Sequence, residues 1–208
     1  MVNRSVAASF LLAGALLATQ AIGAAPARVG DCALIDSAGE FHQLSRYGDK
    51  EALVLMAFDA SCGSMQSQVD QFEALEATWR DRDIVFGIIN ATPSATIDAA
   101  RSAQASFAIE LPFMLDSSQL VTRTLGLTKA GEVTVLNPAR LSSFYAGDLD
   151  SADASIEAKL SGKDAIAAAS LSGCELSFPS LDAIAATPPD YATDVAPIVI
   201  EQCASCHR

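Results

Sequence analysis

A run of seven apolar residues, Ala52–Phe58, constrains the fold of this chain more than any other stretch. A continuous apolar segment of this length predicts a central strand that is buried on both faces. Apolar residues then recur at steps of four and three from Met65 to Trp79, which predicts an amphipathic helix. Cys62 lies between the two, near the expected helix start, where unpaired N–H groups and the helix dipole favour a thiolate. Cys62 is therefore the first candidate for a reactive group.

The rest of the chain alternates between strand and helix patterns. A hairpin is expected over Cys32–His42, strands over 84–89, 112–116 and 132–136, and a hairpin partner of the last strand over 141–147. Helices are expected from a cap at Ser94 through Phe107, over 119–125, and over 154–171. Strands alternating with helices predict an α/β fold with parallel crossovers, and the closing hairpin makes the sheet mixed.

The first 24 residues have the pattern of a secretory signal peptide. Arg4 precedes the apolar block Phe10–Ala18, and small residues follow at Ala21, Gly23 and Ala24. The block is too short to span a bilayer of about 30 Å, so cleavage and export to the periplasm are expected, with an uncleaved anchor as the alternative. We expect no membrane span after cleavage.

Acidic residues dominate the mature chain. The whole sequence has 13 basic and 25 acidic residues, so removal of Arg4 leaves 12 − 25 = −13. Such a charge repels phosphate backbones and argues against nucleic-acid binding.

Five cysteines remain after the signal peptide: Cys32, Cys62, Cys174, Cys203 and Cys206. In an oxidising compartment an odd number leaves at least one thiol unpaired or otherwise used. Cys174 could pair with Cys32 or with Cys62, because connectivity does not follow from spacing. The alternative for Cys62 is a small buried thiol without chemistry, and Cys32 is expected to be a packing residue of the first strand.

Three other polar residues are assigned structural places. His42 is expected at the surface or in a turn, and Asp116 and Glu132 are expected to be solvated or sheet-end carboxylates.

Several short segments together resemble the thioredoxin-like superfamily. They are Asp59–Cys62 after the buried strand, Leu111–Phe113 with Asp116, and Gly131–Leu136. The N-terminal hairpin and the unit Pro93–Phe107 are similar to the redoxin and peroxiredoxin branch. The chain resembles in particular bacterial exported peroxiredoxin-like domains that precede a c-type cytochrome segment. The resemblance covers about residues 28–208 and implies a thioredoxin-like domain over 28–172 with Cys62 as its catalytic residue.

The sequence departs from the pattern of that superfamily at three places. Met65 stands where thioredoxins have their second cysteine, and a thioether forms no disulfide. Asp59 stands where peroxiredoxins have a threonine, and a carboxylate there disfavours a neighbouring thiolate. Ala130-Gly131 replaces the usual cis-proline. A resolving thiol must therefore come from another cysteine or from an external thiol.

The sequence ends with Cys203-Ala204-Ser205-Cys206-His207, a C-x-x-C-H motif typical of c-type haem attachment. Cys203 and Cys206 would form thioethers to the haem vinyl groups, and His207 would be the axial ligand of the iron. A disulfide or half of a zinc site are the alternatives. We expect residues 173–208 to be a linker and the start of a cytochrome c-like segment that continues in a longer protein, with haem c held only if that protein completes the domain.

Two functions follow as hypotheses. The first is an exported, peroxiredoxin-like thiol oxidoreductase that acts through Cys62 on thiol, disulfide or peroxide substrates. The alternative is a scaffold or docking module whose redox site has decayed and which is attached to a c-type cytochrome with an electron-transfer partner.

Overall fold

The computed structural model describes residues 28–166 and 173–204. Its centre is a mixed seven-stranded sheet with the order β2-β1-β5-β4-β3-β6-β7. The strands are β1 (Ala33–Asp36), β2 (Phe41–Gln43), β3 (Ala52–Phe58), β4 (Ile84–Asn90), β5 (Phe113–Leu115), β6 (Val133–Asn137) and β7 (Ser142–Gly147). Strands β3, β4 and β5 are parallel to one another, and the strands outside them pair antiparallel. The mixed α/β sheet expected from the sequence is confirmed.

Strand β3 is the central strand that its apolar run predicts. All seven of its residues are buried. It pairs in parallel with β4 along its whole length, from Ala52 opposite Ile84 to Phe58 opposite Asn90, and antiparallel with β6. Its carboxyl end therefore lies in the middle of the sheet edge, where the chain leaves for the first helix.

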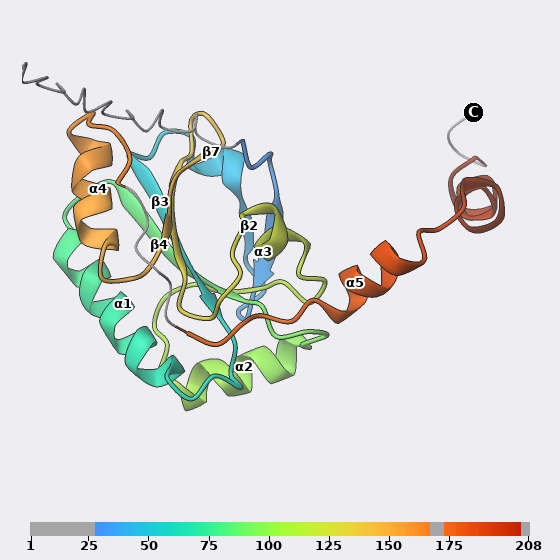
Figure 1. Cartoon of the computed structure of the whole chain (residues 1–208), viewed down its shortest axis with the longest axis horizontal. Helices are drawn as coiled ribbons and strands as arrows, with labels where there is room; N and C mark the ends of the chain where they lie inside the picture. Colours follow the sequence, from blue (N-terminus) through green and yellow to red (C-terminus); the bar gives the residue numbers. More distant parts are fainter. Residues whose placement is uncertain (1–27, 167–172, 205–208) are drawn as a thin grey trace, which may run out of the picture.

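Helices cover both faces of the sheet (Figure 1). They are α1 (Met65–Trp79), α2 (Ile97–Ser106), α3 (Leu120–Thr124) and α4 (Ala152–Leu160), with a 3₁₀ turn η1 (Leu44–Tyr47). Helices α1 and α4 lie on one face, and α3 lies on the opposite face. Phe58 makes edge-to-face contacts with Phe107 and Phe113, with ring centroids 5.0 Å apart in each pair. Such aromatic pairs bury large apolar surfaces and fix the orientation of the elements around β3.

Two helix boundaries differ from the sequence prediction. Ser94 has a φ of 56°, so it is a turn residue, and the cap of α2 is Thr96, whose side chain accepts from the backbone N–H of Ala99 at 3.2 Å. Helix α4 ends at Leu160 and does not continue to 171 as expected. Gly162 follows with a φ of 68°, the left-handed conformation that ends many helices. The expected helical residues 167–172 lie outside the described residues.

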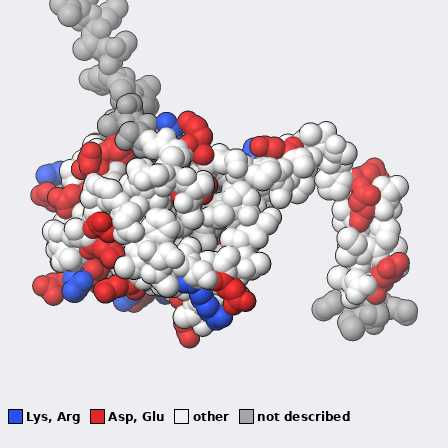
Figure 2. All heavy atoms as spheres, turned by 90° about the horizontal axis from the view of Figure 1, so that it is seen from below, with Lys and Arg blue, Asp and Glu red and all other residues white. Residues whose placement is uncertain are grey.

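Residues 173–204, which we call the arm, run from the sheet edge away from the domain (Figure 1). The arm contains α5 (Pro179–Ala186), η2 (Tyr191–Val195), α6 (Ala196–Ile198) and η3 (Val199–Cys203). It has five acidic and no basic residues, and Figure 2 shows acidic side chains along its projecting length. Across 28–166 and 173–204, no helix has the length and apolar composition that a membrane crossing requires.

Candidate thiol–disulfide site

Cys62 lies in the loop between β3 and α1, as the sequence pattern predicted. Turn hydrogen bonds hold this loop: the N–H of Cys62 donates to the Asp59 carbonyl at 3.1 Å, and the N–H of Met65 donates to the Cys62 carbonyl at 3.0 Å. The Asp59 carboxylate accepts from the N–H and the hydroxyl of Ser61 at 2.9 and 2.8 Å. This carboxylate is therefore engaged within the loop.

A disulfide joins Cys62 to Cys174, which is 112 residues further along the chain, with a Cα–Cα distance of 5.7 Å. The sequence left Cys32 and Cys62 open as partners of Cys174, and the structure selects Cys62. Met65, which takes the position of the second thioredoxin cysteine, is a fully buried core residue. The second thiol of the site thus comes from the arm.

Backbone pairing holds the start of the arm against the loop before β6. The N–H of Ala130 donates to the Cys174 carbonyl at 2.9 Å, and the N–H of Leu176 donates to the Thr128 carbonyl at 2.8 Å. Between these bonds, the Lys129 ammonium lies 3.4 Å from the Glu175 carboxylate. The arm therefore adds a short antiparallel pair to this loop, which positions Cys174 beside Cys62.

Two side chains from the α3 region also contact the arm. Gln119 is only 1% exposed, and its amide donates to the carbonyls of Ala91 and Ser177 at 2.7 and 2.6 Å. Arg123 lies over the ring of Phe178 at 5.7 Å and 3.4 Å from the Asp182 carboxylate. The Gln119 amide thus connects the end of β4 to the arm.

Glycines allow the chain segments around the disulfide to approach closely. Gly131 has a φ of 84°, and a Cβ there would lie 2.2 Å from the amide nitrogen of Gln68. Gly173 has a φ of 144°, and a Cβ there would lie 2.7 Å from the Ala130 carbonyl oxygen. The Gln68 side chain therefore occupies the space above Gly131, at the position where the superfamily pattern has a cis-proline.

The start of α1 can stabilise negative charge on Cys62. No acidic residue lies in the first turn of α1, and its N-cap residue Ser64 makes no side-chain cap hydrogen bond. The Ser64 hydroxyl lies 3.4 Å from the Cys62 sulfur. Free N–H groups, the helix dipole and this hydroxyl all favour a thiolate when the disulfide opens.

Solved structures of other proteins share the fold of this chain. The crystal structure of a hypothetical protein from Sinorhizobium meliloti superposes with a TM-score of 0.63 at 18% identity, covering 73% of this chain and 92% of that one. Peroxidoxin BcpB from Mycobacterium tuberculosis gives a TM-score of 0.54 at 15% identity, covering 66% and 96% of the two chains. A candidate thiol:disulfide interchange protein DsbE from Chlorobium tepidum gives 0.56 at 14% identity, covering 65% and 96%.

The chain has a thioredoxin-like fold. No family model matches the sequence, and no curated protein matches it. At identities below 20%, the three structures establish the fold and not the chemistry of the site.

Two carboxylates at strand ends of the thioredoxin-like domain are buried. Asp116 is 1% exposed and accepts from the N–H and hydroxyl of Thr122 at 2.7 and 2.8 Å. Glu132 is 5% exposed and accepts from the N–H groups of Thr128 and Lys129 at 2.6 and 3.1 Å. The expectation of a sheet-end position is confirmed, because Asp116 directly follows β5 and Glu132 directly precedes β6, but neither carboxylate is solvated. They are buried because local N–H groups satisfy them, and Glu132 shapes the loop that pairs with the arm.

The C-x-x-C-H residues do not meet the Cys62 site within the described chain. Cys203 is exposed at the end of η3, and the helical turns around it contain no buried residue. Cys206 and His207 lie outside the described residues, as do residues 1–24 of the expected signal peptide. Residues 173–204 alone do not supply the apolar enclosure that a haem face requires.

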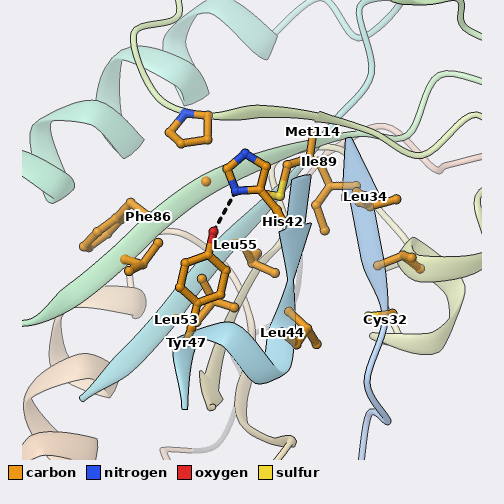
Figure 3. Close-up of a pocket in the computed structure, with 14 residues that line it drawn as sticks. Cys32, Leu34, His42, Leu44, Tyr47, Leu53, Leu55, Phe86, Ile89 and Met114 are labelled. Carbon is orange, nitrogen blue, oxygen red and sulfur yellow. Dashed lines mark hydrogen bonds between the residues drawn. The ribbon is translucent and has the colours of Figure 1, made fainter. Parts of the chain in front are cut away.

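A narrow apolar crevice lies beside η1, on the face of the sheet opposite α1 (Figure 3). His42 is in strand β2, and its ring contacts the Tyr47 hydroxyl at 2.6 Å and the Asp36 carboxylate at 3.0 Å. Although burial opposes ionisation of Asp36, hydrogen bonds from His42 and from the Glu40 N–H lower its pKa. The crevice volume is about 20 Å³, room for roughly one water molecule. His42 and Tyr47 therefore connect the hairpin to η1, and the crevice is too small for a substrate.

Three residues near the disulfide or the arm could not be identified from the sequence. Ser64 and Gln68 belong to an ordinary helical pattern, and Gln119 is a left-handed residue before a short helix, with a φ of 58°. Cys174 could be named only as one possible partner of Cys32 or Cys62. Their roles follow from the fold, which brings α1, α3 and the arm to one edge of the sheet.

Proposed function

We propose that this chain is an exported thiol–disulfide oxidoreductase in which Cys62 and Cys174 form the redox pair. The observation that carries the proposal is the disulfide between the cysteine at the start of α1 and an exposed cysteine of the arm. A helix N-terminus stabilises a thiolate, and a thiolate is the form that takes part in exchange.

The reaction exchanges one disulfide for another. A substrate thiolate attacks one sulfur of the Cys62–Cys174 bond, a mixed disulfide forms, and the other cysteine leaves as a thiolate. The second substrate thiolate then attacks the substrate sulfur of the mixed disulfide and releases the remaining cysteine. The substrate ends as a disulfide, the protein as two thiols, and two protons pass from substrate to protein. The reverse sequence reduces a substrate disulfide.

A direct test uses a reduced peptide with two cysteines as substrate. The oxidised protein should convert it to its disulfide with a stoichiometry of about one, and the Cys62→Ser and Cys174→Ser variants should lose this activity. Cys32→Ser is the matched control, because Cys32 is partly buried and outside the pair. Equal activity in Cys62→Ser and the unmodified protein would contradict the proposal and favour the scaffold alternative.

Peroxide is the second substrate class that the resemblance raises. The Asp59 carboxylate, engaged with Ser61, stands where peroxiredoxins place a hydroxyl, and this weighs against efficient peroxide binding. The reduced protein is therefore expected to oxidise slowly with hydrogen peroxide and faster with the peptide disulfide. The reverse order of rates would assign the protein to peroxide chemistry.

Export is part of the proposal and rests on the pattern of residues 1–24. A disulfide persists in an oxidising compartment, which is consistent with the periplasm. Fractionation of a bacterial host that expresses the chain should recover the processed protein in the periplasmic fraction, with residue 25 or a close neighbour at its N-terminus.

We further propose that Cys203, Cys206 and His207 attach haem c when a longer protein encloses them. The motif supports this proposal, and haem would supply one-electron transfer there. Co-expression of a chain extended beyond Arg208 with haem-attachment machinery should give a protein with covalently bound haem, visible by its absorption spectrum. A colourless extended product would contradict haem attachment without affecting the Cys62–Cys174 proposal.

A further inference from the structure

The two cysteines of the disulfide differ in their exposure to solvent. Cys62 is 3% exposed, enclosed between its loop and the arm, whereas Cys174 is exposed. Thiol–disulfide exchange requires a thiolate to reach one of the two sulfurs, and access decides which one it reaches. In the oxidised protein, an incoming thiolate therefore meets Cys174 first.

The two sulfurs also differ as leaving groups. Attack on Cys174 expels Cys62, whose negative charge is received by the start of α1 and by the Ser64 hydroxyl at 3.4 Å. Attack on Cys62 would expel Cys174, which lies beside Glu175 in an extended segment. The better stabilised thiolate leaves faster. Access and leaving-group stability thus favour the same sulfur.

We propose that Cys174 is the sulfur that exchanges with partner thiols and that Cys62 is the internal leaving and returning thiolate. This inference rests on the proposed function and names the roles within the same site. It reverses the assignment from the sequence, in which Cys62 was the residue facing the substrate.

A partner thiolate forms a bond to the Cys174 sulfur, the Cys62–Cys174 bond breaks, and Cys62 leaves with the electron pair as a thiolate. A second partner thiol then displaces Cys174. In the opposite direction, the Cys174 thiolate opens a partner disulfide, and the Cys62 thiolate releases the partner by attacking Cys174.

The arm keeps Cys174 in place during the mixed-disulfide stage. Its bonds to Ala130 and Thr128 and the Gln119 bond to Ser177 involve no sulfur atom, so opening the disulfide removes none of them directly. In the proposed cycle these contacts keep the Cys62 thiolate close to Cys174, and it can return after the partner has reacted. A partner therefore docks from the exposed side of the arm, away from α1.

The test identifies the sulfur that carries the first adduct. The other cysteines are removed by Cys32→Ser, Cys203→Ser and Cys206→Ser, and the oxidised protein is mixed with reduced glutathione. Acid stops the reaction before one turnover, pepsin digests the protein at low pH, and mass spectrometry locates the glutathione. We expect at least tenfold more adduct on Cys174 than on Cys62. Equal amounts, or more on Cys62, would overturn the inference.

A second measurement separates this inference from the proposed function. If glutathione leaves the disulfide intact and the peptide assay also shows no exchange, the proposed function fails and the role assignment fails with it. If the peptide assay succeeds and the adduct lies on Cys62, only the role assignment fails.

Ser64→Ala should slow the glutathione reaction several-fold by removing the hydroxyl beside the leaving thiolate. Ser67→Ala, an exposed serine in the first turn of α1, should leave the rate unchanged.

Discussion

At the scale of single residues, Gly131 and Gln68 pack closely together near the disulfide. Gly131 has a left-handed backbone, and the Gln68 side chain fills the space where a Cβ would lie. Gly126 has a similar φ of 75° with no heavy atom within 4 Å of a built Cβ. A substitution at Gly126 therefore introduces backbone strain alone, whereas a substitution at Gly131 introduces backbone strain and a steric clash.

Substitution of Gly131 by alanine should cost more stability than the same change at Gly126. We expect Gly126→Ala to lower the free energy of unfolding by about 1 kcal/mol, from the left-handed backbone alone. Gly131→Ala adds a clash with Gln68 and should cost about 2–4 kcal/mol in total. Urea unfolding of the oxidised proteins measures both, and the added change Gln68→Ala should restore part of the loss. Equal costs at the two glycines would contradict the close packing.

The free thiol of Cys32 should react slowly with alkylating reagents. Burial raises the pKa of the Cys32 thiol, and the carboxylates of Asp31 and Asp116 raise it further. A raised pKa leaves less thiolate at pH 8, so iodoacetamide should label exposed Cys203 at least tenfold faster than Cys32. The difference should vanish in concentrated urea. Equal labelling rates in the native protein would show that Cys32 is accessible and ionised.

Sequence patterns predicted some of these residues and missed others. Cys62 was predictable because its position depends on a local strand end and a local helix start. The pairing with Cys174 was not, because 112 residues separate the two and only the complete sheet brings them together. The sheet-end positions of Asp116 and Glu132 were predictable, but their burial was not, because their partners are N–H groups of nearby loops, whose conformation no periodicity encodes.

At the scale of elements, the start of the arm behaves as an added strand of the loop before β6. Two backbone bonds, the Lys129–Glu175 ion pair and the Gln119 amide fix it there. The ion pair lies at the surface, with the Glu175 carboxylate 76% exposed, so its contribution is small. The buried Gln119 amide is the stronger contact because it satisfies the carbonyls of two elements.

Replacement of Gln119 by leucine should loosen the arm. The carbonyls of Ala91 and Ser177 would lose their donors, at a cost of about 1–3 kcal/mol in stability. A looser arm lowers the effective concentration of Cys174 at Cys62, so the disulfide should become easier to reduce by about 20–60 mV. Gln71→Leu, at an exposed position of α1, is the matched control. An unchanged reduction potential in Gln119→Leu would show that the backbone pairing alone holds the arm.

Most elements were predictable because their patterns are strong. The apolar run of β3 and the helical period of α1 gave both elements, and the hairpins followed from their turns. The end of α4 was missed because an alanine-rich stretch reads as helix through Gly162, whose left-handed backbone ends it. The short pair between the arm and residues 128–130 has no sequence pattern, because it depends on two backbone bonds.

At the scale of the whole molecule, the disulfide closes a loop that contains most of the domain. Cross-linking residues 112 positions apart restricts the unfolded chain and is worth about 4–5 kcal/mol in the chain-entropy description. Oxidation therefore couples the stability of the entire thioredoxin-like domain to the state of one bond at its sheet edge.

Reduction should lower the stability of the domain without unfolding it. We expect the free energy of unfolding to fall by about 2–5 kcal/mol when the disulfide is reduced. Urea unfolding with and without dithiothreitol measures the difference, and the double variant Cys62→Ser with Cys174→Ser should match the reduced protein under both conditions. A double variant as stable as the oxidised protein would show that the disulfide contributes nothing to folding.

A redox titration tests most directly whether Cys62 and Cys174 exchange electrons as a pair. The variant that retains only these two cysteines is equilibrated in glutathione and dithiothreitol buffers of known potential. The free thiols are then alkylated and counted by mass. We predict a single two-electron transition between about −120 and −270 mV, the range of thiol–disulfide oxidoreductases. A disulfide that stays intact below about −300 mV would identify a structural bond and contradict the proposed redox role of Cys62 and Cys174.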